Sequence, residues 1–162
     1  MMGPVSYRFR ADVVVPGTAS GEVLKSSEPL SFWGGYDAKT GEIVDRRHPL
    51  SGMIALGKVL VVPFTKGSST TSAILLEAVR IGTAPAAIVS RGRDAFLSLA
   101  SIVADEMYQK TIPILAASDE DFDRLRSGQI LDIDADGVVT IADNEVSDDS
   151  TLDDVGSWRD AE

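Results

Sequence analysis

The residues best suited to chemistry lie in one short stretch, where Lys66 and Gly67 precede four hydroxyl side chains at positions 68–71. Upstream, the apolar run at 59–62 predicts a buried strand over 58–62 that breaks at Pro63, and downstream the pattern becomes helical. The first N–H groups of a helix have no partner within the helix, and a glycine lets the backbone approach a ligand closely. This order of elements therefore predicts a cradle for a carboxylate or another oxyanion, with a serine hydroxyl within reach.

The same stretch is also typical of a well-capped helix that binds nothing, because Ser and Thr are favoured N-cap residues. One cap needs only one hydroxyl, whereas this run offers four, and Lys66 adds a cation beside the turn. The P-loop spacing, Gly-x4-Gly-Lys-Ser/Thr, is absent. On the residues alone, a binding site and a purely structural cap are evenly balanced interpretations.

Composition excludes several classes of function. The chain of 162 residues carries 25 acidic and 15 basic residues, a formal net charge of −10, which argues against nucleic acid or an anionic membrane as the main partner. It has no cysteine and one histidine, which excludes thiolate-held clusters and multi-histidine metal sites built by this chain itself. No run has the length of a transmembrane helix, and the N-terminus MMGPVSYRFR lacks the apolar core of a signal peptide. We therefore expect a cytoplasmic protein.

An α/β body must position the hydroxyl run. Predicted strands at 58–62, 86–89 and 112–115 alternate with predicted helices at 72–81 and 95–107, as in parallel α/β units. The predicted apolar faces comprise Ile74, Leu75, Ala78 and Val79 on the first helix, and Phe96, Leu99, Ala100, Val103 and Met107 on the second.

Segments rich in β structure flank this central unit. They are predicted strands at 7–15 and 21–25, a loop with short hairpin pieces at 31–45, and a hairpin of 129–133 with 137–141. A short helix at 119–126, with Ser118 as its N-cap, precedes the hairpin. We expect one domain over 1–141 and an acidic, disordered tail over 142–162 in which Trp158 is a lone exposed aromatic.

Two charged loops carry weaker signals. His48 precedes Pro49, and acid–base work is one role for such a histidine, but packing within the loop is the favoured interpretation. Arg46 and Arg47 suit an acidic substrate or partner. The Arg-Gly-Arg run at 91–93 fits either a phosphate contact or, preferably, a solvated helix entry.

An aromatic pair stands before two glycines. Phe32 and Trp33 precede Gly34 and Gly35, an arrangement found at interfaces and also in plugs at the edge of a core. We predict that this pair belongs to an interface.

Two segments together resemble the small, swivelling-domain subunit of the aconitase X family: EPLSFWGGYDAKTGEIVDRRHPL at Glu28–Leu50 and GKVLVVPFTKGSSTTS at Gly57–Ser72. The resemblance covers about 21–141. It implies a three-layer β/β/α swivelling domain and a lyase, specifically a hydro-lyase, assembled from this subunit and a larger one. In that family the larger subunit holds an iron–sulfur or iron centre through its cysteines, which fits the absence of cysteine here. The family's activities are dehydration of cis-3-hydroxy-L-proline in bacterial members and of phosphomevalonate in archaeal ones.

The resemblance also implies roles for particular residues. In other aconitases the swivel domain carries a Gly-Ser-Ser-Arg motif, whose first serine is the base and whose arginine binds a substrate carboxylate. On that analogy Ser68 is the catalytic serine, and Ser69 joins Lys66, Gly67 and Thr70 in the substrate-binding set. Thr70 stands where the arginine is expected, so Lys66 or a residue of the large subunit must supply the cation.

We therefore predict the small subunit of a heterodimeric dehydratase that acts on a small hydroxy acid, with cis-3-hydroxy-L-proline preferred. The stretch His48-Pro49-Leu50 is nearer the bacterial members, and few basic residues surround Gly67. No metal is expected on this chain alone. A phosphomevalonate dehydratase small subunit and a non-catalytic swivelling or binding module stay open as alternatives. Phosphohistidine carriers share the fold but need a histidine at the helix start, where this chain has residues TTSA at 70–73.

Overall fold

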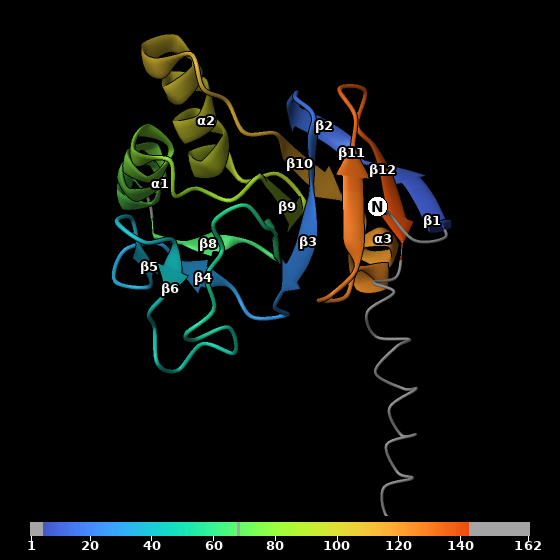
Figure 1. Ribbon diagram of the computed structural model, residues 1–162, viewed down its shortest axis with the longest axis horizontal. Coiled ribbons are helices and arrows are strands. Elements are labelled where there is room, and N and C mark those ends of the chain that lie inside the picture. Colours follow the sequence, from blue (N-terminus) through green and yellow to red (C-terminus); the bar gives the residue numbers. More distant parts are fainter. Residues whose placement is uncertain (1–4, 68, 143–162) are drawn as a thin grey trace, which may run out of the picture.

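The structure, a computed structural model, describes residues 5–67 and 69–142, with the side chains of 5, 6 and 69 left out (Figure 1). Eight strands form one sheet in the order β1-β12-β11-β3-β7-β9-β10-β2. At its centre lie the parallel strands β7 (Val59–Val62), β9 (Ala87–Arg91) and β10 (Ile114–Ala117). They are joined by α1 (Ser69–Ile81) and α2 (Ala95–Tyr108). The predicted strand–helix–strand–helix–strand unit is confirmed.

The sheet curls so far that its two edge strands are consecutive in the chain. The sequence predicted a single strand over 7–15, but the chain forms β1 (Val5–Arg10) and β2 (Asp12–Val15) with Ala11 between them. The Ala11 N–H donates to the Gly137 carbonyl at 2.8 Å. This turn lets β1 pair with β12 (Val138–Ala142) while β2 pairs with β10. The single long strand was therefore wrong, because the two halves serve different edges.

The strand β3 (Ala19–Lys25) joins the parallel part of the sheet to an antiparallel hairpin. It runs parallel to β7 and antiparallel to β11 (Ile130–Ile133), which pairs with β12. The predicted hairpin is confirmed, and its turn is closed by the Asp134 carboxylate, which accepts from the N–H groups of Asp136 at 2.9 Å and Val138 at 3.0 Å. The helix α3 (Asp119–Arg124) is capped by Ser118, as predicted.

Two apolar cores divide the molecule into three layers. Figure 1 shows α1 and α2 on one side of β9 and β10, with β3, β11, β12 and β1 on the other. The core beneath the helices contains Leu60, Val62, Leu75, Ala78, Ile88 and Leu97, among others. The core enclosed by the curled sheet contains Val59, Val61, Val89, Phe122, Leu131 and Ile141, among others. Successive residues of β7 thus face opposite cores, and all four are buried, which makes this strand a rigid base for the loop that follows it.

The apolar face predicted for α1 is confirmed, with Leu75, Ala78 and Val79 buried and Ile74 partly buried. The face predicted for α2 was largely wrong. Its buried residues are Leu97, Ala100, Ser101 and Ala104, whereas Phe96, Leu99 and Met107 are exposed. Two overlapping apolar stripes run along this helix, and the one with the smaller side chains packs against the sheet and α1, where close approach of the backbones favours small residues.

A small lobe lies beside the carboxyl end of β7. It consists of the parallel pair β4 (Leu30–Ser31) and β8 (Thr65–Lys66), and the hairpin β5 (Tyr36–Asp37) with β6 (Glu42–Ile43). The predicted loop with short hairpin pieces over 31–45 is confirmed.

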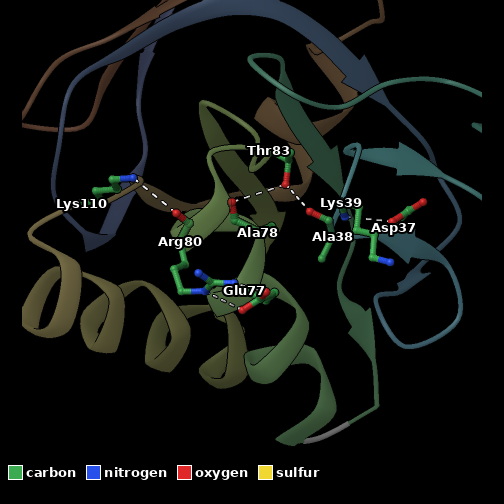
Figure 2. A network of polar contacts seen from close by, with 8 residues as sticks. All are labelled: Asp37, Ala38, Lys39, Glu77, Ala78, Arg80, Thr83 and Lys110. Atoms are coloured by element: carbon green, nitrogen blue, oxygen red, sulfur yellow. Dashed lines mark hydrogen bonds and ion pairs between the residues drawn. The ribbon is translucent and has the colours of Figure 1, made fainter.

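The lobe is tied to the end of α1 through Thr83, as Figure 2 shows. The Thr83 hydroxyl donates to the carbonyls of Ala38 at 2.5 Å and Ala78 at 3.4 Å, and its own carbonyl accepts from the Tyr36 hydroxyl at 2.8 Å. Because these contacts bring the segment 36–38 onto the helix end, the lobe and α1 form one unit. The tail predicted over 142–162, with Trp158, lies outside the described residues apart from Ala142. No helix in the described ranges is long and apolar enough to cross a membrane.

Candidate functional site

The candidate site is the loop from Pro63 to Gly67, which connects the carboxyl end of β7 to the start of α1. In parallel sheets, ligands bind beyond the carboxyl ends of the strands. Within this loop, β8 pairs with β4 in the register Leu30 to Thr65 and Ser31 to Lys66. The loop is therefore held at a fixed place beside the small lobe.

Gly67 adopts a conformation that other residues avoid. Its φ of +104° lies in the left-handed region, and a Cβ there would come within 3.2 Å of Thr70 Oγ1 and 3.5 Å of Thr71 Oγ1. The Thr71 hydroxyl donates to the Lys66 carbonyl at 3.2 Å, which closes the turn from inside. One of the four hydroxyls is thus a structural element of the turn, and Thr71 is buried.

The helix begins earlier than predicted, at Ser69 rather than residue 72. Ser and Thr are weak helix formers in the interior, but they are favoured at helix starts, where their hydroxyls satisfy free backbone groups. Part of the predicted binding set therefore belongs to the first turn of α1, with Thr70 partly buried there. Ser68, the predicted catalytic residue, lies outside the described residues, as does the side chain of Ser69, and their roles stay predictions.

Sequence analysis missed Asp94, which contacts the loop directly. The Asp94 carboxylate accepts from both the N–H and the hydroxyl of Thr65, at 2.9 Å and 2.6 Å. It is also the N-cap of α2. An aspartate directly before a helical pattern is an N-cap signal that the sequence does contain; the second contact, to a residue 29 positions away, has no local signal.

The basic side chains near the loop differ in whether they form ion pairs. Arg91 pairs with Asp119 at 3.1 Å and Asp123 at 3.3 Å, and Arg93 pairs with Asp12 at 3.0 Å. These pairs favour the predicted helix-entry role over a phosphate contact. Lys66 is exposed, and none of the ion pairs found among the described residues involves it. Its ammonium group is therefore available to an anion at the loop.

The predicted aromatic interface pair is half wrong. Phe32 is fully buried and stacks on Tyr36, with ring centroids 4.9 Å apart, so it belongs to the core. Trp33 is 67% exposed, and Phe64, in the candidate loop, is 50% exposed. The Ser31 hydroxyl donates to the Trp33 carbonyl at 2.9 Å. The structure therefore presents one aromatic ring on the small lobe and one on the candidate loop.

The neighbouring bend is fixed by Gly35. A Cβ at Gly35 would collide with the Ser31 carbonyl oxygen, so only glycine lets the chain fold back there. At this bend the Phe32 ring is buried in the core, whereas the Trp33 indole is exposed.

His48 is buried, in agreement with the predicted packing role. Its Nδ1 accepts from the Leu50 N–H at 3.1 Å, which closes a tight loop. Arg46 and Arg47 lie exposed on the same loop. Within residues 5–67 and 69–142, no three His, Cys, Asp or Glu side chains come close enough together to hold a metal ion, so that part of the chain offers no ligand set for an iron centre.

Helices on one face of a parallel unit, with the curled antiparallel half of the sheet behind it, define a swivelling β/β/α domain. Residues 8–141 match the family model described as "Aconitase X swivel domain". The chain belongs to that family, which confirms both the resemblance and the fold.

Named relatives fall into two groups. A "Cis-3-hydroxy-L-proline dehydratase" of Pseudomonas aeruginosa is 47% identical over 112 residues, which cover 69% of this chain and 19% of the relative. A "Phosphomevalonate dehydratase small subunit" of Methanothermobacter thermautotrophicus is 37% identical over 125 residues, which cover 76% of this chain and 91% of the relative. This chain therefore spans about a fifth of the length of the bacterial relative.

A solved structure has the same fold. The "Crystal structure of Thermococcus kodakaraensis aconitase X (holo-form)" is similar with a TM-score of 0.75 and 32% sequence identity, covering 87% of this chain and all of that one.

Proposed function

We propose that this chain is the small, swivelling subunit of a hydro-lyase that dehydrates cis-3-hydroxy-L-proline together with a larger aconitase X chain. The observation that carries the proposal is the 47% identity to the bacterial protein named for that reaction. The candidate loop supports it: an uncommitted cation at Lys66, a glycine turn and the start of a helix of 13 residues follow one another at the end of a buried strand.

The reaction is a β-elimination, and we assign its base to Ser68. The base takes the proton α to the carboxylate, the electron pair of that C–H bond forms the new double bond, and the hydroxyl on the adjacent carbon leaves with the electron pair of its C–O bond and takes up the abstracted proton to give water. A free serine is far too weak a base for this step. The N–H groups at the start of α1 and the positive end of its dipole would stabilise the serine anion, as oxyanion holes do.

The metal belongs, in this proposal, to the larger chain. An iron or iron–sulfur centre held there would supply a Lewis acid for the leaving hydroxyl. The described residues of the small chain contribute the other half of the site. Lys66 faces the substrate carboxylate, a role that belongs in other aconitases to an arginine where this chain has Thr70. Gly67 lets the backbone approach the substrate. This division supports a heterodimer with a site at the contact between the two chains.

The exposed aromatic residues indicate which side faces the larger chain. Trp33 and Phe64 lie on the small lobe and the candidate loop, which pair through β4 and β8. Large exposed aromatics are typical anchors of interfaces. Because the reaction needs both chains at the Gly67 loop, we infer that the larger chain packs over these two rings.

The pairing of Arg91 and Arg93 with carboxylates favours a carboxylate over a phosphorylated substrate. Phosphate carries more charge and is usually held by several basic groups. Near the loop, Arg91 and Arg93 are committed to ion pairs, whereas no such pair involves Lys66 in the part of the chain that the structure describes. The archaeal relatives named for phosphomevalonate keep that substrate as the second candidate.

The decisive test is reconstitution with the larger aconitase X chain of the same organism. Each of the two compounds is supplied to the complex, and loss of water is followed by mass spectrometry. We expect turnover of cis-3-hydroxy-L-proline, its abolition by Ser68→Ala with assembly intact, and no effect of Ser20→Ala, an exposed serine on β3. If the complex turns over phosphomevalonate alone, phosphomevalonate is the substrate. If Ser68→Ala turns over at a near-normal rate, Ser68 is not the base. A complex that dehydrates neither compound would leave the non-catalytic module as the better interpretation.

A further inference from the structure

The contacts of Asp94 give this residue a second task besides capping α2. We propose that Asp94 is a positioning residue that holds the Lys66–Gly67 turn in its working geometry by fixing Thr65. The effect on turnover rests on the proposed function, whereas the effect on the loop does not.

The two carboxylate oxygens of Asp94 serve different segments. Oδ1 accepts from the N–H groups of Phe96 at 3.1 Å and Leu97 at 3.3 Å, the first turn of α2. Oδ2 accepts from Thr65, through its N–H at 2.9 Å and its hydroxyl at 2.6 Å. One side chain therefore joins the helix start to the residue directly before Lys66.

The Asp94 side chain that makes this bridge is buried. Asp94 is 8% exposed, and its four donors among the described residues are backbone N–H groups and one hydroxyl, with no cation among them. A buried carboxylate must have its hydrogen-bonding capacity satisfied. The Thr65 contacts supply half of these donors, so the position of the loop and the burial of the charge depend on each other.

Other backbone contacts hold the start of the loop, where the Arg91 N–H donates to the Pro63 carbonyl at 3.1 Å and the Leu30 N–H to the Phe64 carbonyl at 3.3 Å. β8 is only two residues long and pairs with β4 on one edge. The Thr65 N–H is already committed to Asp94, which places that carboxylate where the next strand of a sheet would lie. Beyond Thr65, the turn is closed by the bond from the Thr71 hydroxyl to the Lys66 carbonyl. A shift at Thr65 would therefore pass directly to Lys66 and Gly67.

A second hydrogen bond joins the two helix starts. The Ser72 hydroxyl, in the first part of α1, donates to the Phe96 carbonyl at 2.8 Å. The Ser98 hydroxyl donates to the Asp94 carbonyl at 2.9 Å and steadies the cap. The turn before α1 and the start of α1 are thus both hydrogen-bonded to the start of α2, and Asp94 makes the bonds to the turn.

The Asn variant separates the two tasks of this side chain. Asp94→Asn keeps an acceptor for the α2 N–H groups, because Asn is as good an N-cap as Asp. It replaces the other oxygen with an NH2 group, which cannot accept from the Thr65 N–H and faces it as a second donor. The helix start should survive while the loop loses its anchor. Thr65→Val tests the same contact from the other side, since it removes the hydroxyl donor and keeps the N–H.

The experiment measures loop order and turnover in parallel. Amide hydrogen exchange over residues 65–67 is followed in the isolated chain for wild type, Asp94→Asn, Thr65→Val and the double variant. The same proteins are then assayed in complex with the larger chain. Ser118→Ala, which removes the N-cap of α3, is the control for the loss of a cap away from the loop. We expect faster exchange at 65–67 in the Asp94 and Thr65 variants and not in the control.

For turnover, we expect kcat to fall about 10- to 100-fold in Asp94→Asn, because small misplacements of reacting groups have effects of this size. Thr65→Val should fall less, and the double variant should be no worse than Asp94→Asn, since both remove one shared contact. Unchanged exchange over 65–67, or wild-type kcat in Asp94→Asn, would overturn the proposal. If the wild-type complex shows no turnover, the proposed function fails, and the exchange data alone decide whether Asp94 positions the loop.

Discussion

The rings of Phe32 and Tyr36 stack with their centroids 4.9 Å apart and their planes 24° from parallel. This pair lies at the bend that carries Trp33. The Tyr36 hydroxyl donates to the Thr83 carbonyl, just beyond the end of α1. An aromatic stack and a buried hydrogen bond thus add to the β4–β8 pairing and the Thr83–Ala38 contact that hold the small lobe beside the candidate loop.

Removal of the Tyr36 hydroxyl tests that anchor. Tyr36→Phe keeps the stack but leaves the Thr83 carbonyl without the buried donor, which should lower the free energy of unfolding by about 1–3 kcal/mol. Urea denaturation of the two proteins at pH 8 measures the difference. Lys39→Ala, at an exposed position of the turn between β5 and β6, is a suitable control in the same lobe.

The same pair of proteins makes a pH prediction. Burial raises the pKa of Tyr36 well above its ordinary value of about 10. The unfolded chain therefore loses this proton first, so the stability that Tyr36 contributes is complete below pH 10 and is lost as the pH rises further. Wild type should lose more stability than Tyr36→Phe between pH 9 and 11, and the gap between them should shrink. A constant gap across this range would contradict burial of the phenol.

Local patterns predicted the elements well where one environment surrounds a segment. The four residues of β7 are all buried and were predicted as a strand, and Ser118 and the Asp134–Gly137 turn follow local capping and turn rules. The break at Ala11 was missed because its cause is the pairing of two halves with strands far away in the chain.

The errors at the site have the same origin. Phe32 and Trp33 are adjacent and chemically alike, yet one is in the core and the other is exposed. The glycines that follow them allow the chain to bend, but tertiary packing decides which of the two rings is buried. Asp94 was recognisable as a helix cap, but its contact with Thr65 joins two loops that the sheet brings together. The position of the hydroxyl run at a helix start was predictable; the group that holds this run in place was not.

Gly67 can be tested against another glycine of similar conformation. Ala at a φ of +104° is strained by about 1–2 kcal/mol, and its methyl group would also press on the hydroxyl of Thr70. Gly128, with a φ of +97° and open space around it, is the matched control. We expect Gly67→Ala and Gly128→Ala to lower the melting temperature similarly, while only Gly67→Ala lowers kcat of the complex by at least tenfold. Equal turnover in both variants would mean that the loop tolerates a side chain and does not contact the substrate.

The proposed contact with the larger chain can be tested by truncating exposed side chains. Trp33→Ala should weaken binding of the larger chain about 10- to 30-fold, as the loss of a central aromatic anchor does, with little change in stability because the ring is 67% exposed. Leu99→Ala is the control. Leu99 is 50% exposed and lines an open apolar groove between β2 and α2, together with Val14 and Ile102. Affinities for the larger chain, measured by interferometry, decide between the Trp33 face and the α2 face. A larger loss of affinity in Leu99→Ala would mean that the larger chain binds at α2.

Lys66 provides the test of how the substrate carboxylate is held. If its ammonium group replaces the arginine expected at position 70, Lys66→Met should raise KM about 10-fold or more with a smaller effect on kcat, since the carboxylate carries the same charge in the ground state and in the transition state. The apparent KM of wild type should also rise with ionic strength, because this ion pair forms at an exposed site, and that salt dependence should weaken in Lys66→Met. Lys58→Met is the control, since Lys58 pairs with Glu22 at 3.2 Å at the opposite end of β7. A wild-type KM in Lys66→Met would transfer the carboxylate contact to the larger chain and leave the small chain with the turn and the helix start alone.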